Sequence, residues 1–295
     1  MLISELIDKT FMEWLYPAGD DQPAYDFLLA EINATVLALT LEGRTNRVAR
    51  SSILEIDSEV ILTKDVSGPA VTIADRGFLN TTPGSHNIGA LVKIDPTFTR
   101  KACLDAARAI IANLYPWGVY QRAIDTAQTY QTTGVFALPT GGREVLSILV
   151  RRSTDGEQWD RLKHPGEDWV MYTEFDPGKY QMRARGITGA QMLVVYMKDW
   201  AIPSVETDEL NTLGLPTALQ EGLSMGVAGW VLRGREIPRV LADRIRELLS
   251  TQGVQVGASL NIGNALLDLF KREFVTTERR RLSELDPPGF EYVGR

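Results

Sequence analysis

The run SILEIDSEVILTKDVSGPAVTIA, residues 52–74, decides the fold. Its apolar and β-branched residues come in short groups, and Asp, Ser, Gly and Pro separate one group from the next. Groups of this kind, bounded by turn residues, are typical of β-strands. The strands predicted here and just downstream are Ser52–Ile56, Val60–Thr63, Ala70–Ala74 and Ala90–Ile94. They predict a small β module over residues 45–97.

Apolar residues at helical spacing flank this module. In residues 1–44 they predict two helices, which the polar stretch Gly19–Pro23 separates. The positions that define these helices are Leu2, Leu6, Ile7, Phe27, Leu28, Ile32, Val36, Leu37 and Leu41. After the module, residues 98–122 hold a middle helix, which stops before Tyr115 and Pro116 because a residue before proline disfavours helix.

A second β module is predicted over residues 123–203. Its strand-like runs, such as Val145–Val150 and Met192–Tyr196, are separated by turns that contain Gly or Pro, and this spacing indicates a sandwich or barrel-like unit. Residues 204–285 predict C-terminal helices, and residues 286–295 predict an extended tail. The predicted fold class is therefore α+β, with a helical bundle core of N-terminal, middle and C-terminal helices and two inserted β-rich modules.

Composition restricts the classes of function. The chain has 295 residues, of which 44% are hydrophobic, enough for a sizeable core. Its net charge of -7 argues against a surface that grips nucleic acid all round, but it leaves room for a local basic patch. The single cysteine, Cys103, excludes an intrachain disulfide and is expected to be buried in a helix. No signal peptide or membrane span is expected, and synthesis in a reducing cytoplasm follows.

Residues that could perform catalysis or bind a metal are scarce. Only two histidines are present, and neither His86 nor His164 lies in an established catalytic or metal-ligand spacing. We expect a structural role for His86 in its loop, and a turn with solvated acids for the segment His164–Asp168. Phosphate-binding loops, nucleophile elbows and zinc-protease motifs do not occur in the sequence. The sequence therefore predicts no catalytic residues, no cofactor and no metal.

Two helical stretches suggest contacts with other surfaces. Small residues at three- and four-residue spacing allow close helix packing, either within the chain or against another subunit. These subunit-packing candidates are Ala218, Gly222, Gly226 and Gly229. Near the C-terminus, basic residues crowd the helix, but interspersed glutamates favour an ion-paired, solvated face over a DNA-binding stripe.

Several segments together resemble the head-to-tail adaptor, or neck, proteins of long-tailed bacteriophages, particularly those that infect actinobacteria. The first is Arg76–Ala90, which is similar to an R-G-x-x-x-T-x-x-x-x-H-x-x-G stretch in such virion proteins. The others are Leu114–Tyr120, Leu213–Pro216, Gly226–Glu236 and Glu278–Leu282. The likeness extends over most of the chain as a pattern of soft motifs.

The resemblance implies a structural protein of the virion and not an enzyme. It implies a ring of about twelve copies between the portal protein and the next component, a head-to-tail stopper or tail protein. Such a ring extends the DNA channel, so its contact with the genomic DNA is transient and non-specific, and no membrane is involved. The implied portal contacts are Arg279, Arg280, Arg281, Phe290 and Tyr292.

Other functions stay open at this level. A tail-terminator or baseplate subunit would have a similar composition. A carbohydrate-binding protein for adsorption would use exposed aromatic residues of the second β module, namely Trp159, Trp169, Tyr172 and Tyr180. A hydrolase would depend on His86 or His164.

Overall fold

A computed structural model describes the chain over most of its length. The described residues are 1–16, 23–43, 45–129, 131, 134–151, 159–162, 169–172, 179–182, 191–233 and 262–285. The chain divides into two compact units. Unit 1 comprises Met1–Ile110, Pro203–Thr212 and Gln220–Lys271, and unit 2 comprises Ile111–Ile202, Leu213–Leu219 and Arg272–Arg295.

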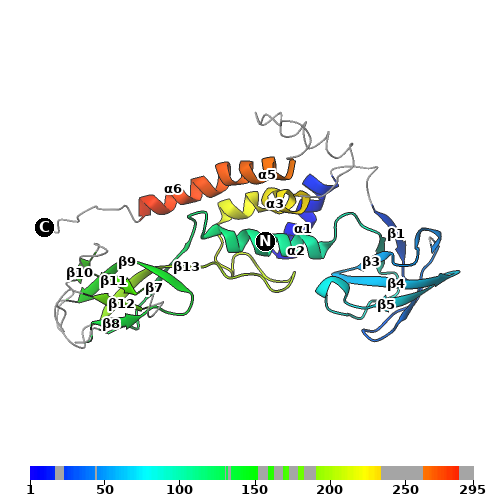
Figure 1. Ribbon diagram of the computed structural model, residues 1–295, viewed down its shortest axis with the longest axis horizontal. Coiled ribbons are helices and arrows are strands. Elements are labelled where there is room, and N and C mark those ends of the chain that lie inside the picture. The colour runs from blue at the N-terminus through cyan, green and yellow to red at the C-terminus, as the bar shows by residue number, and fades with distance from the viewer. Residues whose placement is uncertain are drawn as a thin grey trace. The chain divides into compact units, whose positions relative to one another are not determined.

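Unit 1 contains a six-stranded antiparallel sheet in the order β1-β6-β3-β4-β5-β2 (Figure 1). Its strands are β1 (Ala24–Phe27), β2 (Ala38–Thr40), β3 (Ile53–Ile56), β4 (Glu59–Ser67), β5 (Ala70–Asp75) and β6 (Leu91–Ile94). The sheet curls until its two outer strands meet, where Leu28 pairs with Leu41 and the Leu29 N–H donates to the Thr40 oxygen at 2.8 Å. All six strands or their flanking residues contribute to one cluster of buried apolar side chains.

Strands form over residues 52–94 because the turns between them suit reversal of the chain. Asp57 has a φ of 51° in the β3–β4 turn, and Gly68 has a φ of 59° in the β4–β5 turn. Asp and Gly tolerate this left-handed region better than other residues do. The predicted strand runs thus coincide with β3, β4, β5 and β6, but the sheet they form also includes β1 and β2.

Residues 24–40 correct the sequence prediction, which placed a helix there. They form β1 and β2, and a turn at Asn33 separates the two strands, with the Asn33 side-chain oxygen accepting the N–H of Thr35 at 2.9 Å and of Val36 at 3.1 Å. Leu28, Ile32 and Leu41 belong to the apolar set that predicted the helix, but they are buried in the cluster of the curled sheet. Pairing with β6 and β5 satisfies backbone groups that the outer strands would otherwise expose, and this outweighs the local helical pattern.

The helices of unit 1 are α1 (Ile3–Thr10) with a π-helical turn Phe11–Leu15, α2 (Arg100–Leu114), α3 (Thr217–Leu232) and α5 (Ile262–Phe270), of which α2 and α3 extend into residues of unit 2. α2 starts where the Thr99 hydroxyl accepts the N–H of Ala102 at 3.1 Å, as a helix N-cap does. α3 and α5 lie side by side in Figure 1, in backbone contact at Gly229 and Gly263.

Unit 2 holds two further antiparallel sheets. One has the order β10-β9-β13-β7 and the other the order β11-β12-β8. The strands are β7 (Gln121–Asp125), β8 (Val135–Ala137), β9 (Gly142–Arg151), β10 (Trp159–Leu162), β11 (Trp169–Tyr172), β12 (Lys179–Met182) and β13 (Met192–Lys198). Phe136 of β8 packs in one buried cluster with side chains of β9 and β13, so the two sheets share a core. α6 (Thr276–Leu285) follows a π-helical turn, Lys271–Val275.

The predicted helical bundle core with inserted modules is wrong. The described residues form a mixed α+β fold with more strand than that prediction allowed, and the curled sheet and the second pair of sheets each have a hydrophobic cluster of their own. The curled sheet therefore forms a hydrophobic core of its own, and so does the pair of sheets in unit 2. Among the described helices, none is long and apolar enough to cross a membrane.

Candidate functional site: a buried ion network and two arginine-bearing helices

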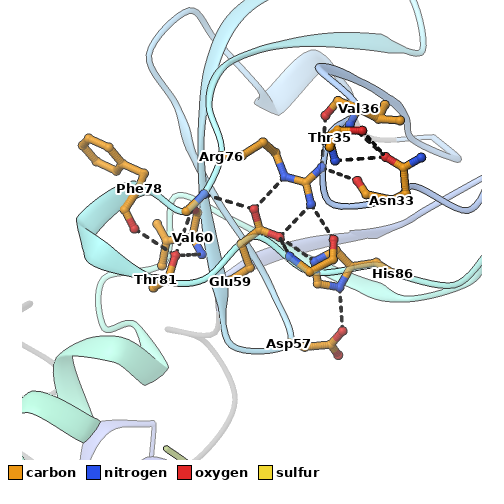
Figure 2. Close-up of polar contacts among 12 residues, drawn as sticks. Asn33, Thr35, Val36, Asp57, Glu59, Val60, Arg76, Phe78, Thr81 and His86 are labelled. Carbon is orange, nitrogen blue, oxygen red and sulfur yellow. Dashed lines mark hydrogen bonds and ion pairs between the residues drawn. The ribbon is translucent and has the colours of Figure 1, made fainter. Parts of the chain in front are cut away.

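The segment Arg76–Ala90 wraps around the buried carboxylate of Glu59. Glu59 is the first residue of β4 and is 1% exposed. Arg76, which directly follows β5, donates from Nε to Oε1 at 2.6 Å and from Nη2 to Oε2 at 2.8 Å (Figure 2). This is a two-pronged, charge-assisted pair, the strongest common form of a side-chain hydrogen bond.

The remaining donors of Arg76 are also used. Nη1 donates to the carbonyl oxygens of Asn33 at 2.8 Å and Val36 at 3.0 Å, and Nη2 donates to the Gly84 oxygen at 2.7 Å. A guanidinium has five N–H groups, so every donor of Arg76 has an acceptor. Arg76 therefore joins β4, the β1–β2 connection and the segment after β5.

His86 completes the network from the other end of that segment. Its Nε2 lies 2.8 Å from Glu59 Oε2, and its Nδ1 lies 2.8 Å from Oδ2 of Asp57. Carboxylates only accept hydrogen bonds, so both ring nitrogens are best satisfied when both carry protons. The hydrogen bond to Glu59 raises the pKa of His86; burial opposes this, and Asp57 adds to it. His86 is thus held as an imidazolium between two carboxylates.

Glu59 itself is held ionised. Burial alone would raise its pKa, but the hydrogen bonds from Arg76, His86 and the Gly84 N–H outweigh it and lower the pKa to about 2. The Gly77 N–H also donates to Oε1, at 3.1 Å. A carboxylate with so low a pKa is a weak base, and the lone pairs that a base would use are occupied.

Two residues fix the loop around the network. Gly77 has a φ of 68°, and a Cβ at this position would stand 2.6 Å from the Thr81 oxygen and 2.8 Å from Pro83 Cδ. The Thr81 hydroxyl accepts the Val60 N–H at 3.0 Å and donates to the Phe78 oxygen at 3.0 Å. Only glycine fits position 77, which accounts for the Arg-Gly pair of the motif.

A second network holds the start of α2. Arg100 binds Glu206 and Asp8 through its guanidinium, at 2.8 Å and 2.5 Å. Its backbone N–H donates to Glu55 Oε1 at 2.5 Å, and Lys93 binds the other oxygen of Glu55 at 2.9 Å. Burial raises the pKa of Glu55, with Lys93 and Arg100 acting in the opposite direction. Within unit 1 these contacts connect α1, β3, β6, α2 and the segment after Pro203.

The predicted portal contacts are placed only in part. Phe290 and Tyr292 lie outside the described residues. Arg281 donates from Nε to both carboxylate oxygens of Glu278, at 3.0 Å and 2.9 Å, and Glu278 is 3% exposed. Arg279 is exposed on α6 with its side chain close to Gly118, and Arg280 is exposed. Among the described residues, neither the Arg279 nor the Arg280 guanidinium has a hydrogen bond or ion pair, so both are available to a partner, whereas Arg281 binds Glu278.

The subunit-packing candidates are largely occupied within the chain. A Cβ on Gly226 would stand 3.1 Å from the Phe270 ring and 3.2 Å from Ile110 Cδ1. One on Gly229 would stand 2.8 Å from the Gly263 oxygen. Gly222 is buried, whereas Ala218 is exposed. Intrachain packing, one of the two alternatives left open by the sequence, therefore accounts for Gly226 and Gly229.

Glu59 and Asp57 were not identified from the sequence, because isolated acids in a strand and a turn carry no spacing signal. The one local signal in the sequence is the pair of turn residues Asp57 and Ser58, which predicts a hairpin turn directly before Glu59. The segment His164–Asp168 lies outside the described residues, and so do the side chains of Trp159, Trp169, Tyr172 and Tyr180, so the carbohydrate-binding alternative stays a prediction. Among the described residues, no group of three or more His, Cys, Asp or Glu could hold a metal ion.

Comparisons with known proteins give little further information. No protein-family model matches the chain, and no curated protein sequence matches it significantly. Among solved structures, the chain is similar to one described as the neck of an empty GTA particle computed with C6 symmetry. The two are 11% identical, and the match covers 59% of this chain and 80% of that chain with a TM-score of 0.23. At this TM-score the likeness does not establish a common fold.

Proposed function

We propose that the chain is a structural subunit of the neck of a tailed bacteriophage, acting as a head-to-tail adaptor and not as an enzyme. The observation that carries the proposal is the structural role of the segment Arg76–Ala90. This segment is one of several that resemble adaptor proteins, and its charged groups close a buried network in which the Arg76 and His86 donors are satisfied. Such a network stabilises the loop that contains it.

A ring subunit fits these features physically. It must hold a fixed shape while DNA passes and while other components dock, and buried, fully bonded ions help to specify one shape. The proposed ring has about twelve copies. It contacts the portal through Arg279, Arg280 and Arg281 of α6, and it presents its other end to a stopper or tail protein.

The test is electron microscopy of lysates from a phage that carries this gene with an early stop codon. We expect filled heads and free tails that are not joined, with both restored to whole particles when the gene is supplied from a plasmid. Intact tailed particles without the protein would contradict the neck assignment. Heads with tails of abnormal length would instead assign the protein to tail termination.

A further inference from the structure

The connection between β2 and β3 is basic in a chain that is acidic overall. Between Glu42 and Glu55 the sequence contains Arg44, Arg47 and Arg50 and no acidic residue, although the net charge of the chain is -7. Arg47 and Arg50 are exposed, and Arg44 lies outside the described residues. Lys64 of β4 is also exposed. Arg47, Arg50 and Lys64 are called the basic loop patch below.

The backbone that carries the patch is fixed by contacts within the sheet. Val48 is 6% exposed and belongs to the hydrophobic cluster, and its N–H donates to the Thr45 oxygen at 3.0 Å. The Thr63 hydroxyl donates to the Ala49 oxygen at 2.8 Å, so the loop is tied to β4 next to Lys64. Arg47 and Arg50 therefore lie on either side of the buried Val48, in a loop whose backbone is hydrogen-bonded to β4.

Lys64 lies at the same end of the β3–β4 hairpin as Arg50. Ser51 donates its N–H to the Thr63 oxygen at 3.1 Å, which brings residues 50 and 64 next to the same backbone pair. The register between β4 and β5 shifts at this point, between Thr63 and Asp65, so Lys64 lies in a bulge. A bulge changes the direction in which the side chain of its extra residue points, here Lys64.

The described acids around the patch form no ion pair with its cations. Among the described residues, no ion pair or hydrogen bond engages the side chains of Arg47, Arg50 or Lys64. The acids nearby have other partners. Asp95 accepts the Ser52 hydroxyl at 2.7 Å and the Ile53 N–H at 2.7 Å, and Asp65 accepts the Val66 N–H at 3.0 Å.

We propose that the basic loop patch binds the phosphate backbone of duplex DNA, and this rests on the proposed function, which puts DNA within the neck. Arginine and lysine supply the donors and the charge that phosphate recognition needs. Three cations give a weak, salt-dependent contact, which suits DNA that must slide past. A protein partner is less well matched, because protein interfaces are anchored by large apolar side chains, and none of the exposed large apolar residues lies in residues 45–52.

The test uses the full-length protein and a fluorescently labelled duplex of arbitrary sequence, with affinity measured by anisotropy at several salt concentrations. Each phosphate contact contributes a slope of about -0.9 to the plot of log affinity against log salt, so the natural chain should show about -3. The variant Arg47→Gln/Arg50→Gln/Lys64→Gln should lose most of this slope. The matched control is Arg122→Gln/Arg143→Gln/Arg272→Gln, which changes the same charge at exposed positions elsewhere and should keep the slope.

Three results would overturn the proposal: no salt-dependent binding by the natural chain, equal losses in the two triple variants, or preference for polyglutamate over DNA. The last would assign the patch to an acidic protein. The outcome is separate from that of the phage experiment, because a failure to bind DNA in solution leaves the joining of heads to tails unaffected.

Discussion

At the scale of single residues, Glu59 shows how burial raises the free-energy cost of breaking an ion pair. Its carboxylate is 1% exposed and accepts from Arg76, His86 and two backbone N–H groups. The pair is costly to desolvate, but removal of one partner is costlier still, because it leaves a buried charge without compensation. We therefore expect Glu59→Gln to lower the free energy of unfolding by ~3–5 kcal/mol in urea denaturation. Glu42→Gln, at an exposed carboxylate on the same sheet, should change it by less than ~0.5 kcal/mol. Equal effects would contradict the role given to the network.

The two titrating groups of this network should limit the stability of the protein at opposite ends of the pH range. The pKa of His86 is raised above 6.5, chiefly by Glu59, so its contribution is complete below pH 6.5 and is lost as the pH rises through the folded-state pKa. The pKa of Glu59 is lowered from 4.5 to about 2, so its contribution is present above pH 4.5 and is lost as the pH falls toward 2. Stability should therefore decline on both sides of this range.

His86→Gln should abolish the loss of stability that occurs as the pH rises through the folded-state pKa of His86. Urea denaturation between about pH 5 and pH 9 measures the profile, and proton NMR of the imidazole follows the titration directly. The chain has only two histidines, so the signal missing from His86→Gln identifies His86. A His86 signal that titrates at or below pH 6.5 would contradict the geometry.

Gly77 combines a steric and a conformational requirement. Gly77→Ala should destabilise the protein by more than ~2 kcal/mol, because its Cβ meets the Thr81 oxygen and its φ is positive. Gly89→Ala separates the two effects, since Gly89 has a φ of 79° but nothing within 4 Å of the added Cβ. It should cost only ~1 kcal/mol in the same urea titration. Equal costs would show that the loop around Gly77 moves aside.

At the scale of elements, α3 and α5 approach so closely that their backbones touch. A Cβ on Gly229 would stand 2.8 Å from the Gly263 oxygen, and one on Gly263 would stand 2.7 Å from the Gly229 oxygen. Gly229→Ala should force the helices apart and lower stability by ~1–3 kcal/mol, visible as a lower Tm in calorimetry. Gly43→Ala, where the added Cβ meets nothing within 4 Å, is the control and should leave the Tm nearly unchanged. An unchanged Tm for Gly229→Ala would mean that this contact is not maintained in solution.

At the scale of the whole molecule, the exposed Arg280 of α6 gives a prediction about assembly. In a phage complemented with Arg280→Glu, we expect fewer joined particles and more separate heads and tails, counted by electron microscopy. Arg272→Glu makes the same charge change at an exposed position in the preceding π-helical turn, and it should leave particle yield unchanged. Circular dichroism of both purified variants shows whether the fold is intact. Normal particle yield from Arg280→Glu would remove this face from the portal contact.

Features that depend on neighbours along the chain could be predicted from the amino-acid sequence. Turn residues and β-branched runs predicted β3, β4, β5 and β6, and the apolar stripe after Phe98 predicted α2. The Arg-Gly pair and His86 were noted together because the segment Arg76–Ala90 resembles a stretch of adaptor proteins, and that resemblance did not indicate their contacts with Glu59. The positions of the small residues on α3 were also visible, although the surface that covers Gly226 and Gly229 was not.

Tertiary structure decided everything that depends on pairing between distant segments. Residues 24–40 have a helical spacing, but they became β1 and β2 because the sheet gained two strands and closed around its core. Glu59 became the centre of the ion network only when β4, the β1–β2 connection and the loop Gly77–Gly89 came together. Local periodicity reports which face of a segment is apolar, whereas backbone hydrogen bonding with remote strands and charge burial decide what that face packs against.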